Sequence, residues 1–237
     1  EIWGQAWFER GCFSAHFQNM VVEGEQVRAF VERPAPGQTR VRAWAEKADG
    51  TPVLEASASI EPDDGDTLLD QRMAKLRAPE KLIILSDLHV GMKGAKDEKV
   101  RMDLEQHMGN LYPFSLAQKL EVITENTSWY SDPTNGPWDR AIIPMEMVSV
   151  LAEYTSKDAQ FPVKQPVIGL FADQEIRMFD GPLLVGEDYL IRREIVALSE
   201  SKRTESYWVL SSIYDANGEK LKAHMLLNHA TIKHSYA

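Results

Sequence analysis

The chain has 237 residues, of which 43% are hydrophobic, and its formal net charge is −10. This length suits one large domain or two of roughly 100 residues, and every apolar run is far shorter than the ~18 to 20 residues that a membrane-spanning helix needs. A basic patch with interleaved aromatic residues is missing, so nucleic acid is not expected as a partner. Because Cys12 is the single cysteine, neither an intrachain disulfide nor a cysteine-based zinc site can form, and a reducing cytoplasm is expected.

Antiparallel strands are predicted in the first quarter of the chain. Residues 40–45 alternate polar and apolar side chains, Asp49-Gly50 is a hairpin turn, and a strand returns over residues 53–60. The stretch 61–66 is acidic and rich in turn-forming residues, which is typical of a boundary between units.

The stretch LIILSDLHVGMKG, residues 82–94, resembles the opening motif of calcineurin-like metallophosphoesterases. In that family a buried strand delivers an Asp and a His, here Asp87 and His89, to a two-metal centre. Each metal takes about five or six donors, but Gly-Asp-x-x-Asp, Gly-Asn-His and His-x-His do not occur after residue 89. We therefore expect no metal, and we predict that residues 82–85 form a strand in a segment that joins two repeats.

The middle of the chain contains the clearest helix. Before it, residues 96–105 are strongly charged and are predicted to be exposed, as a loop or a solvated helix. Pro144 suits the first turn of a helix. Apolar residues then follow at i, i+3, i+4 and i+7, namely Met147, Val150, Leu151 and Tyr154. This wide apolar stripe predicts a helix that is buried against a sheet.

The last third of the chain is predicted to be strands again, over residues 189–198, 206–214 and 221–233. Residues 17–26 align without a gap with residues 179–188, and each segment is followed by the same order of strands and hairpin turns. We interpret this self-similarity as a tandem duplication.

Residues 179–188, FDGPLLVGED, and the three strands after them resemble MaoC-like dehydratases and related thioester-binding proteins of the hotdog superfamily. The resemblance implies an α+β fold, a tandem (double) hotdog in which curled antiparallel sheets each wrap a central helix. The first repeat is expected at 1–65 with its N-terminal part missing, a connecting segment at 66–109, and the second repeat at 110–237 with its central helix at about 144–155.

The MaoC motif Ser-Gly-Asp-x-Asn-Pro-x-His-x-Asp-Pro carries an Asp and a His that activate water for addition to an enoyl thioester. Placing Asp132 on the motif's last Asp puts Tyr130 at the His position and, with a one-residue deletion, Asn126 at the Asp position. Asn is not a base, and Tyr, with a reference pKa of about 10, is a poor base at neutral pH. The standard pair is therefore absent, and Asn126, Tyr130 and Asp132 are the candidate catalytic residues.

The resemblance also implies substrate-binding residues. A backbone N–H at the start of the central helix polarises the thioester carbonyl in that family, which points to the helix N-terminus at Pro144 and Met145. Trp129 would line the pocket and Arg177 would meet a phosphate of CoA. Two alternatives stay open: Trp129 and Tyr130 plug the pocket, and Arg177 pairs with an acidic side chain across strands.

The resemblance predicts a protein that binds an acyl-CoA or acyl-carrier-protein thioester without a cofactor. It would be a MaoC-like dehydratase/hydratase or a thioesterase with non-standard residues, or a non-catalytic hotdog that binds a ligand or a partner protein. A homo-oligomer, a dimer of double hotdogs, is expected. The spacing of His224 and His229 places them on opposite faces of a strand, so they should not share a metal.

Overall fold

The computed structural model describes residues 2–63, 65–125, 127–132, 134 and 136–236, and all structural statements below refer to these residues. The strands are β1 (Gly11–Phe17), β2 (Val27–Val31), β3 (Arg40–Lys47), β4 (Pro52–Ile60), β5 (Glu98–Arg101), β6 (Gly169–Met178), β7 (Asp188–Glu200), β8 (Thr204–Asp215) and β9 (Leu221–Ile232). The helices are α1 (Gln5–Arg10), α2 (Leu68–Met73), α3 (Leu116–Leu120) and α4 (Met145–Glu153), with 3-10 turns η1 (Ser128–Tyr130), η3 (Ser156–Ala159) and η4 (Lys233–Ser235).

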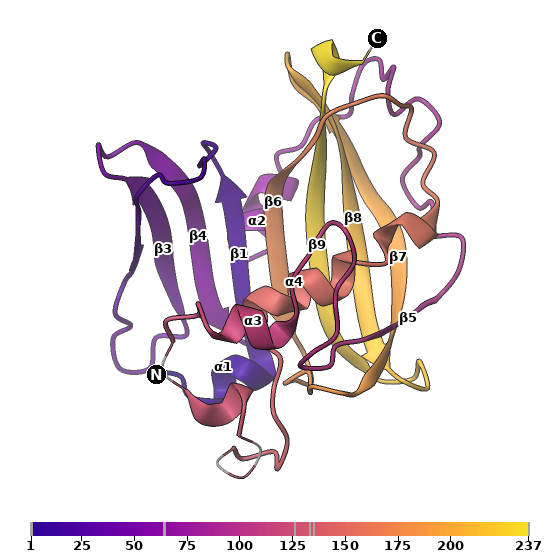
Figure 1. Ribbon diagram of the computed structural model, residues 1–237. Coiled ribbons are helices and arrows are strands. Elements are labelled where there is room, and N and C mark those ends of the chain that lie inside the picture. Colours follow the sequence, from indigo (N-terminus) through magenta and orange to yellow (C-terminus); the bar gives the residue numbers. More distant parts are fainter. Residues whose placement is uncertain (1, 64, 126, 133, 135, 237) are drawn as a thin grey trace.

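The described strands form one antiparallel sheet that is symmetric about the pair β1 and β6. Its order is β2-β3-β4-β1-β6-β9-β8-β7-β5, so that β1-β4-β3-β2 and β6-β9-β8-β7 run outward from the centre in opposite directions (Figure 1). Two similar units side by side would give this order, which agrees with the repeat found in the sequence. The boundaries proposed from the sequence, at 1–65, 66–109 and 110–237, stay a prediction.

Alternation along β1 gives the sheet two different faces. Phe13, Ala15 and Phe17 face α4, whereas Ser14 faces α2, where its hydroxyl accepts a hydrogen bond of 2.9 Å from the backbone N–H of Leu69. Figure 1 shows α4 in front of the sheet and α2 behind it. We call the face that carries α4 the inner face and the other the outer face.

The helix α4 packs on the inner face of the second half of the sheet. Its buried side chains Met147, Val148 and Leu151 join a core that includes Ile176 and Met225, and each such side chain contributes about 1.5 to 3 kcal/mol when it leaves water. The amphipathic helix predicted from the apolar spacing is confirmed. Over the first half of the sheet the described residues supply no counterpart of α4, and the short helix α1 contacts β1 and β4 instead.

A buried ion network joins the end of α4 to the sheet. The Arg193 guanidinium on β7 donates to Glu98 on β5 at 2.8 and 2.9 Å and to Glu153 at the end of α4 at 3.0 Å. The same group donates to the Ser211 hydroxyl on β8 at 2.8 Å. Burial favours such charges only when they are paired and hydrogen-bonded, and all three charged residues here are less than 5% exposed.

The predicted exposure of residues 96–105 is therefore wrong at Glu98–Arg101. These residues form the edge strand β5, which pairs with β7, and its alternate residues Glu98 and Val100 are buried. The charged composition suggested solvent, but Arg193 neutralises the one carboxylate that points inward.

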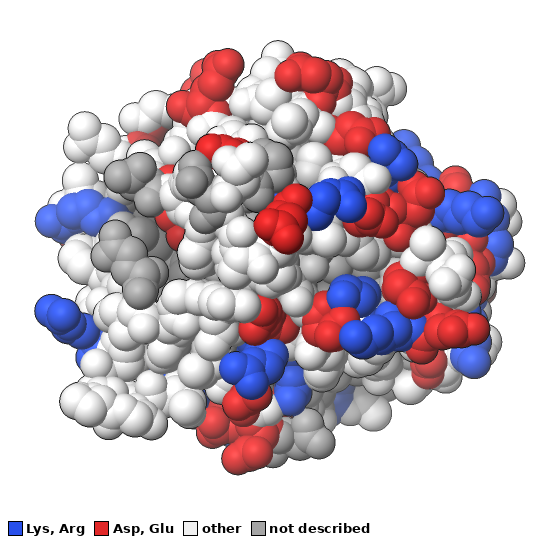
Figure 2. Space-filling model, turned by 90° about the horizontal axis from the view of Figure 1, so that it is seen from below, with Lys and Arg blue, Asp and Glu red and all other residues white. Residues whose placement is uncertain are grey.

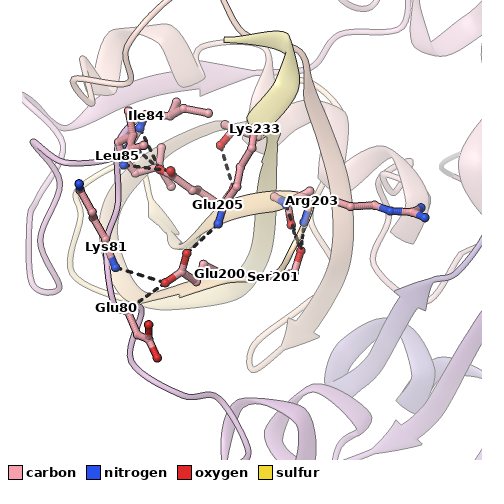
Figure 3. A network of polar contacts seen from close by, with 12 residues as sticks. Glu80, Lys81, Ile84, Leu85, Glu200, Ser201, Arg203, Glu205 and Lys233 are labelled. Atoms are coloured by element: carbon pink, nitrogen blue, oxygen red, sulfur yellow. Dashed lines mark hydrogen bonds and ion pairs between the residues drawn. The ribbon is translucent and has the colours of Figure 1, made fainter.

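The segment before β5 is held by a second buried carboxylate (Figure 3). Glu205 on β8 is 1% exposed and accepts hydrogen bonds of 2.9 to 3.0 Å from the backbone N–H groups of Ile83, Ile84 and Leu85. The strand predicted over residues 82–85 is therefore wrong. A carboxylate rather than a neighbouring strand satisfies these backbone donors.

The surface of the molecule carries charged groups of both signs. Figure 2 shows acidic and basic side chains interspersed over one side of the molecule, beside an area without charged groups. Within the described ranges, none of the helices combines the length and the apolar character needed to cross a bilayer.

Replacing Arg193 with Met should lower the free energy of unfolding by about 3 to 5 kcal/mol at pH 7, because two buried carboxylates lose their counterion. Burial raises the pKa of Glu153, and Arg193 opposes that rise. A carboxyl whose pKa is raised by folding favours the folded state when protonated and loses that contribution as pH rises. Glu153 takes up a proton as pH falls from 7 toward 4.5 and then no longer needs a counterion. The loss of stability in Arg193→Met should therefore become smaller over this range.

Urea unfolding followed by circular dichroism at several pH values measures this effect. Arg203→Met, at an exposed arginine, is the matched control and should change stability by less than about 0.5 kcal/mol. A deficit in Arg193→Met that is small, or that does not depend on pH, would contradict the proposed role of the network.

Candidate functional site

A groove of about 700 Å³ lies on the inner face between the first half of α4 and the central strands. Its floor is formed by Phe13, Ala15 and Phe17 from β1 and by Ile176 from β6. Its remaining walls come from α1, β4, β6, α4 and the segment before α4, namely Trp7, Leu54, Gln174, Met145, Glu146, Met147, Ser149, Val150, Tyr112, Phe114 and Lys119. The lining is mostly apolar, as in pockets that hold the hydrocarbon part of a ligand.

The start of α4 brings hydrogen-bond donors to this groove. First-turn N–H groups have no acceptor within a helix, and Pro144, the N-cap residue, supplies no side-chain cap. Met145 and Glu146, whose backbone N–H groups belong to this turn, both line the groove. Such donors are suited to a carbonyl oxygen that gains negative charge.

Polar side chains in the groove are few and already engaged. The carboxylate of Glu146 forms an ion pair of 2.8 Å with Lys119, whose ammonium also lies 5.7 Å from the ring centre of Phe114. Burial raises the pKa of the Tyr112 phenol to about 12, so it is not a base at neutral pH. Among the described residues that line the groove there is no His or Asp. The groove therefore has donors and apolar walls but lacks a carboxylate–imidazole pair.

Trp129 and Tyr130 lie outside this lining, in an aromatic cluster just before α4. Phe8 packs edge-on against both, at centroid distances of 5.4 and 6.1 Å, and Trp138 contacts Trp129 at 5.3 Å. The hydroxyl of Tyr130 donates to the carboxylate of Glu125. Burial, and then this hydrogen bond, raise the pKa of Tyr130. The two rings thus pack in a cluster outside the groove lining, and both alternatives, that they line the pocket or plug it, stay predictions.

The other predicted site residues are dispersed. Asp132 accepts from the backbone N–H and the hydroxyl of Thr134 at 2.9 and 2.6 Å, as in a local turn. Asn126 lies outside the described residues. Arg177 is on the outer face, where it donates to the carbonyl of Pro62 at 2.5 Å and its guanidinium lies 5.2 Å from the ring centre of Phe179.

The structure thus brings Met145 to the groove and leaves Pro144 as the buried N-cap residue of α4. Trp129 and Tyr130 lie in the aromatic cluster, and Arg177 is on the opposite face. The floor residues of β1 were missed in the sequence. Their signal was the period-two spacing of Phe13, Ala15 and Phe17, which lies immediately before the region where the predicted strands began.

Histidines and acidic residues are not arranged for metal binding. Asp87 and His89 are both exposed in a turn, and no described group of three or more His, Cys, Asp or Glu side chains could hold a metal ion. His224 stacks edge-on against Phe179 and His229 lies flat on Tyr207, on opposite faces of β9. Burial lowers the pKa of each to about 4, so both are neutral at pH 7.

No family model matches this chain, and no curated protein sequence does. Solved structures do resemble it. A protein from Chloroflexus aurantiacus, described as a MaoC domain dehydratase, shares 15% identity with a TM-score of 0.58, over 94% of this chain and 74% of that one. A conserved hypothetical protein from Mycobacterium tuberculosis, described as having a double hotdog fold, shares 11% identity with a TM-score of 0.52, over 96% of this chain and 77% of that one.

At these identities the resemblance establishes the fold. The symmetric sheet, its inner helix α4 and the likeness to a described double hotdog confirm the fold predicted from the sequence. The chain has the α+β double-hotdog fold.

Proposed function

We propose that this protein binds acyl thioesters, as acyl-CoA or acyl-carrier protein, with the acyl chain in the groove between α4 and β1. One observation carries the proposal: the apolar groove begins at the first turn of α4, where Met145 and Glu146 offer backbone N–H donors to the thioester carbonyl. The likeness in fold to a protein described as a MaoC domain dehydratase supports the same ligand class.

We also propose that binding is not coupled to acid–base chemistry. Hydration of an enoyl thioester needs a base and an acid within reach of one water. In the described lining the one carboxylate, that of Glu146, is paired with Lys119. A dehydratase/hydratase or thioesterase would have to use this carboxylate, so Glu146 is the residue on which the enzymatic alternative rests.

We further propose a homo-oligomer in the cytoplasm, and the exposed edge of the sheet supports the oligomer. Edge strands that are left open tend to pair with other chains, and β2 presents Val31, 66% exposed, at the outer edge of the first half. Light scattering on the purified chain should give the mass of a dimer, and a monomer at micromolar concentration would refute this assembly.

Filling the groove should weaken the binding of the acyl chain. Ser149 lies on the exposed side of α4 within the groove lining, so Ser149→Phe places a ring there without adding volume to the core. Octanoyl-CoA should bind at least about tenfold more weakly to this variant, a loss of roughly 1.4 kcal/mol. Isothermal titration calorimetry with octanoyl-CoA and with CoA alone measures the acyl contribution.

Ser86→Phe, at an exposed turn far from the groove in sequence, is the matched control and should bind octanoyl-CoA as the unmodified protein does. If octanoyl-CoA binds no more tightly than CoA, or if both variants bind it equally, the groove is not the acyl site.

The bound thioester should be left intact. We expect neither hydration of crotonyl-CoA nor hydrolysis of octanoyl-CoA above the rate without protein, and Glu146→Gln should change nothing. The release of free thiol and the loss of enoyl absorbance measure the two reactions. Turnover that Glu146→Gln abolishes would instead establish an enzyme, with Glu146 as its base, while Tyr130→Phe serves as a control at a residue outside the groove.

A further inference from the structure

A second and larger cavity, of about 890 Å³, lies on the outer face of the sheet, away from the groove beside α4. It is bounded by the end of α2 and the residues after it, and by β1, β6, β8 and β9. The proposed thioester function makes no use of it. Its floor, mouth and walls each have a distinct chemistry.

The floor is organised around Asp173, which is 1% exposed. Its carboxylate accepts hydrogen bonds from His16 Nδ1 at 2.7 Å, from Arg72 Nε at 2.9 Å and from Asn228 Nδ2 at 2.8 Å. The three strand residues lie directly opposite one another across β1, β6 and β9. They therefore form a single row on the outer face.

The hydrogen bonds of this row determine which atoms of the floor accept. Burial raises the pKa of Asp173, but the hydrogen bonds from His16 and Asn228 outweigh it and the pKa is lowered. An ionised carboxylate only accepts, so Nδ1 of His16 is the donor of this hydrogen bond.

One acceptor in the floor, the amide oxygen of Asn228, lacks a donor. Asn228 is 6% exposed, and its Oδ1 has no hydrogen-bond partner within the described part of the chain. A buried polar atom without a partner is costly. A ligand with a hydroxyl or N–H group would supply the missing donor.

Positive charge collects at the mouth of the cavity, although the protein as a whole is acidic. Lys75 and Arg77 line it, are exposed, and their side chains form no hydrogen bond or ion pair with any described residue. The acidic side chains of the lining are engaged: Asp173 holds the floor, and Glu200 accepts from Lys233 at 2.7 Å. The available charges at the mouth therefore favour an anion.

The walls of the cavity are apolar. Leu76, Val53 and Trp208 lie along them, and Leu170 is 44% exposed at its edge. Large apolar side chains that stay exposed around a polar site are typical of ligand-binding surfaces.

We propose that this cavity is a second ligand site, which binds an amphipathic anion whose body carries a hydrogen-bond donor. The anionic group lies at Lys75 and Arg77, the apolar body lies along Leu170 and Trp208, and the donor reaches the floor at Oδ1 of Asn228. The site is separate from the acyl groove, and its occupancy does not depend on the thioester function.

Dansylaminoundecanoic acid is a suitable probe, because it combines a carboxylate, an apolar chain and a sulfonamide N–H, and its emission rises in apolar surroundings. We expect it to bind the unmodified protein about tenfold more tightly than its methyl ester. In the double variant Lys75→Ala/Arg77→Ala, the acid and its methyl ester should bind with nearly the same affinity. Lys93→Ala/Lys99→Ala removes two exposed charges at the β5 edge of the sheet and is the matched control, for which no change is expected.

The location of the probe is tested separately. The ring signals of His16, assigned with His16→Gln, should shift in the NMR spectrum when the probe is added, and those of His229 on the inner face should not. Ser149→Phe, which fills the acyl groove, should leave probe binding unchanged. Equal affinity for acid and ester, equal effects of the two double variants, or loss of binding in Ser149→Phe would each overturn the proposal.

Discussion

The position of α4 depends on the buried ion network at its last turn. Arg193 joins Glu153 of the helix to Glu98 on β5 and to Ser211 on β8. A buried charge without these partners costs several kcal/mol, so the helix cannot slide or rotate without leaving one of them alone. An apolar contact would tolerate such a shift, because its energy does not depend on direction. The network therefore specifies where the end of α4 lies against the sheet.

That anchor also decides where the acyl groove can form. The last turn of α4 packs against the second half of the sheet. The first half of α4 faces β1, where the described residues include no second long helix. Small Ala15 leaves space between them. The groove thus follows from a sheet of two similar halves, of which, within the described residues, the second alone carries a long helix such as α4 on its inner face.

The strand β1 contributes to both proposed sites because side chains alternate across a strand. Phe13, Ala15 and Phe17 form the floor of the inner groove, and His16, between them, belongs to the outer row with Asp173. A shift of β1 by one residue against β6 would exchange the two sets and remove both floors. The antiparallel register of this central pair is therefore a condition for both sites.

Local patterns in the sequence were enough to predict much of the sheet and the helix. Alternation and turn residues indicated β3, β4 and the three long strands β7 to β9, and apolar spacing indicated α4. The failures involve partners that are distant in the chain. Residues 82–85 had the composition of a strand, but Glu205, more than 100 residues away, takes their N–H groups.

The candidate sites depend even more on partners that are distant in the chain, and local patterns do not predict such partners. Glu98 looked solvated because Arg193, its counterion, is 95 residues further on. Asp173 and His16 are separated by 157 residues, and no local motif marks either of them. The start of α4 was predicted because a helix and its first turn are local features. The residues that complete each site come from the pairing of β1 with β6, which a single sequence does not reveal.

The aromatic cluster before α4 supports the proposal that the groove binds a thioester without transforming it. A hydratase must place a proton donor and acceptor beside the carbonyl, where they act on the transition state more than on the ground state. Here Tyr130 is turned toward Glu125 and is packed against Phe8. Backbone N–H groups at Met145 and Glu146 remain, and they stabilise a carbonyl oxygen in any state. Donors without a proton-transfer group favour binding of the ligand over its reaction.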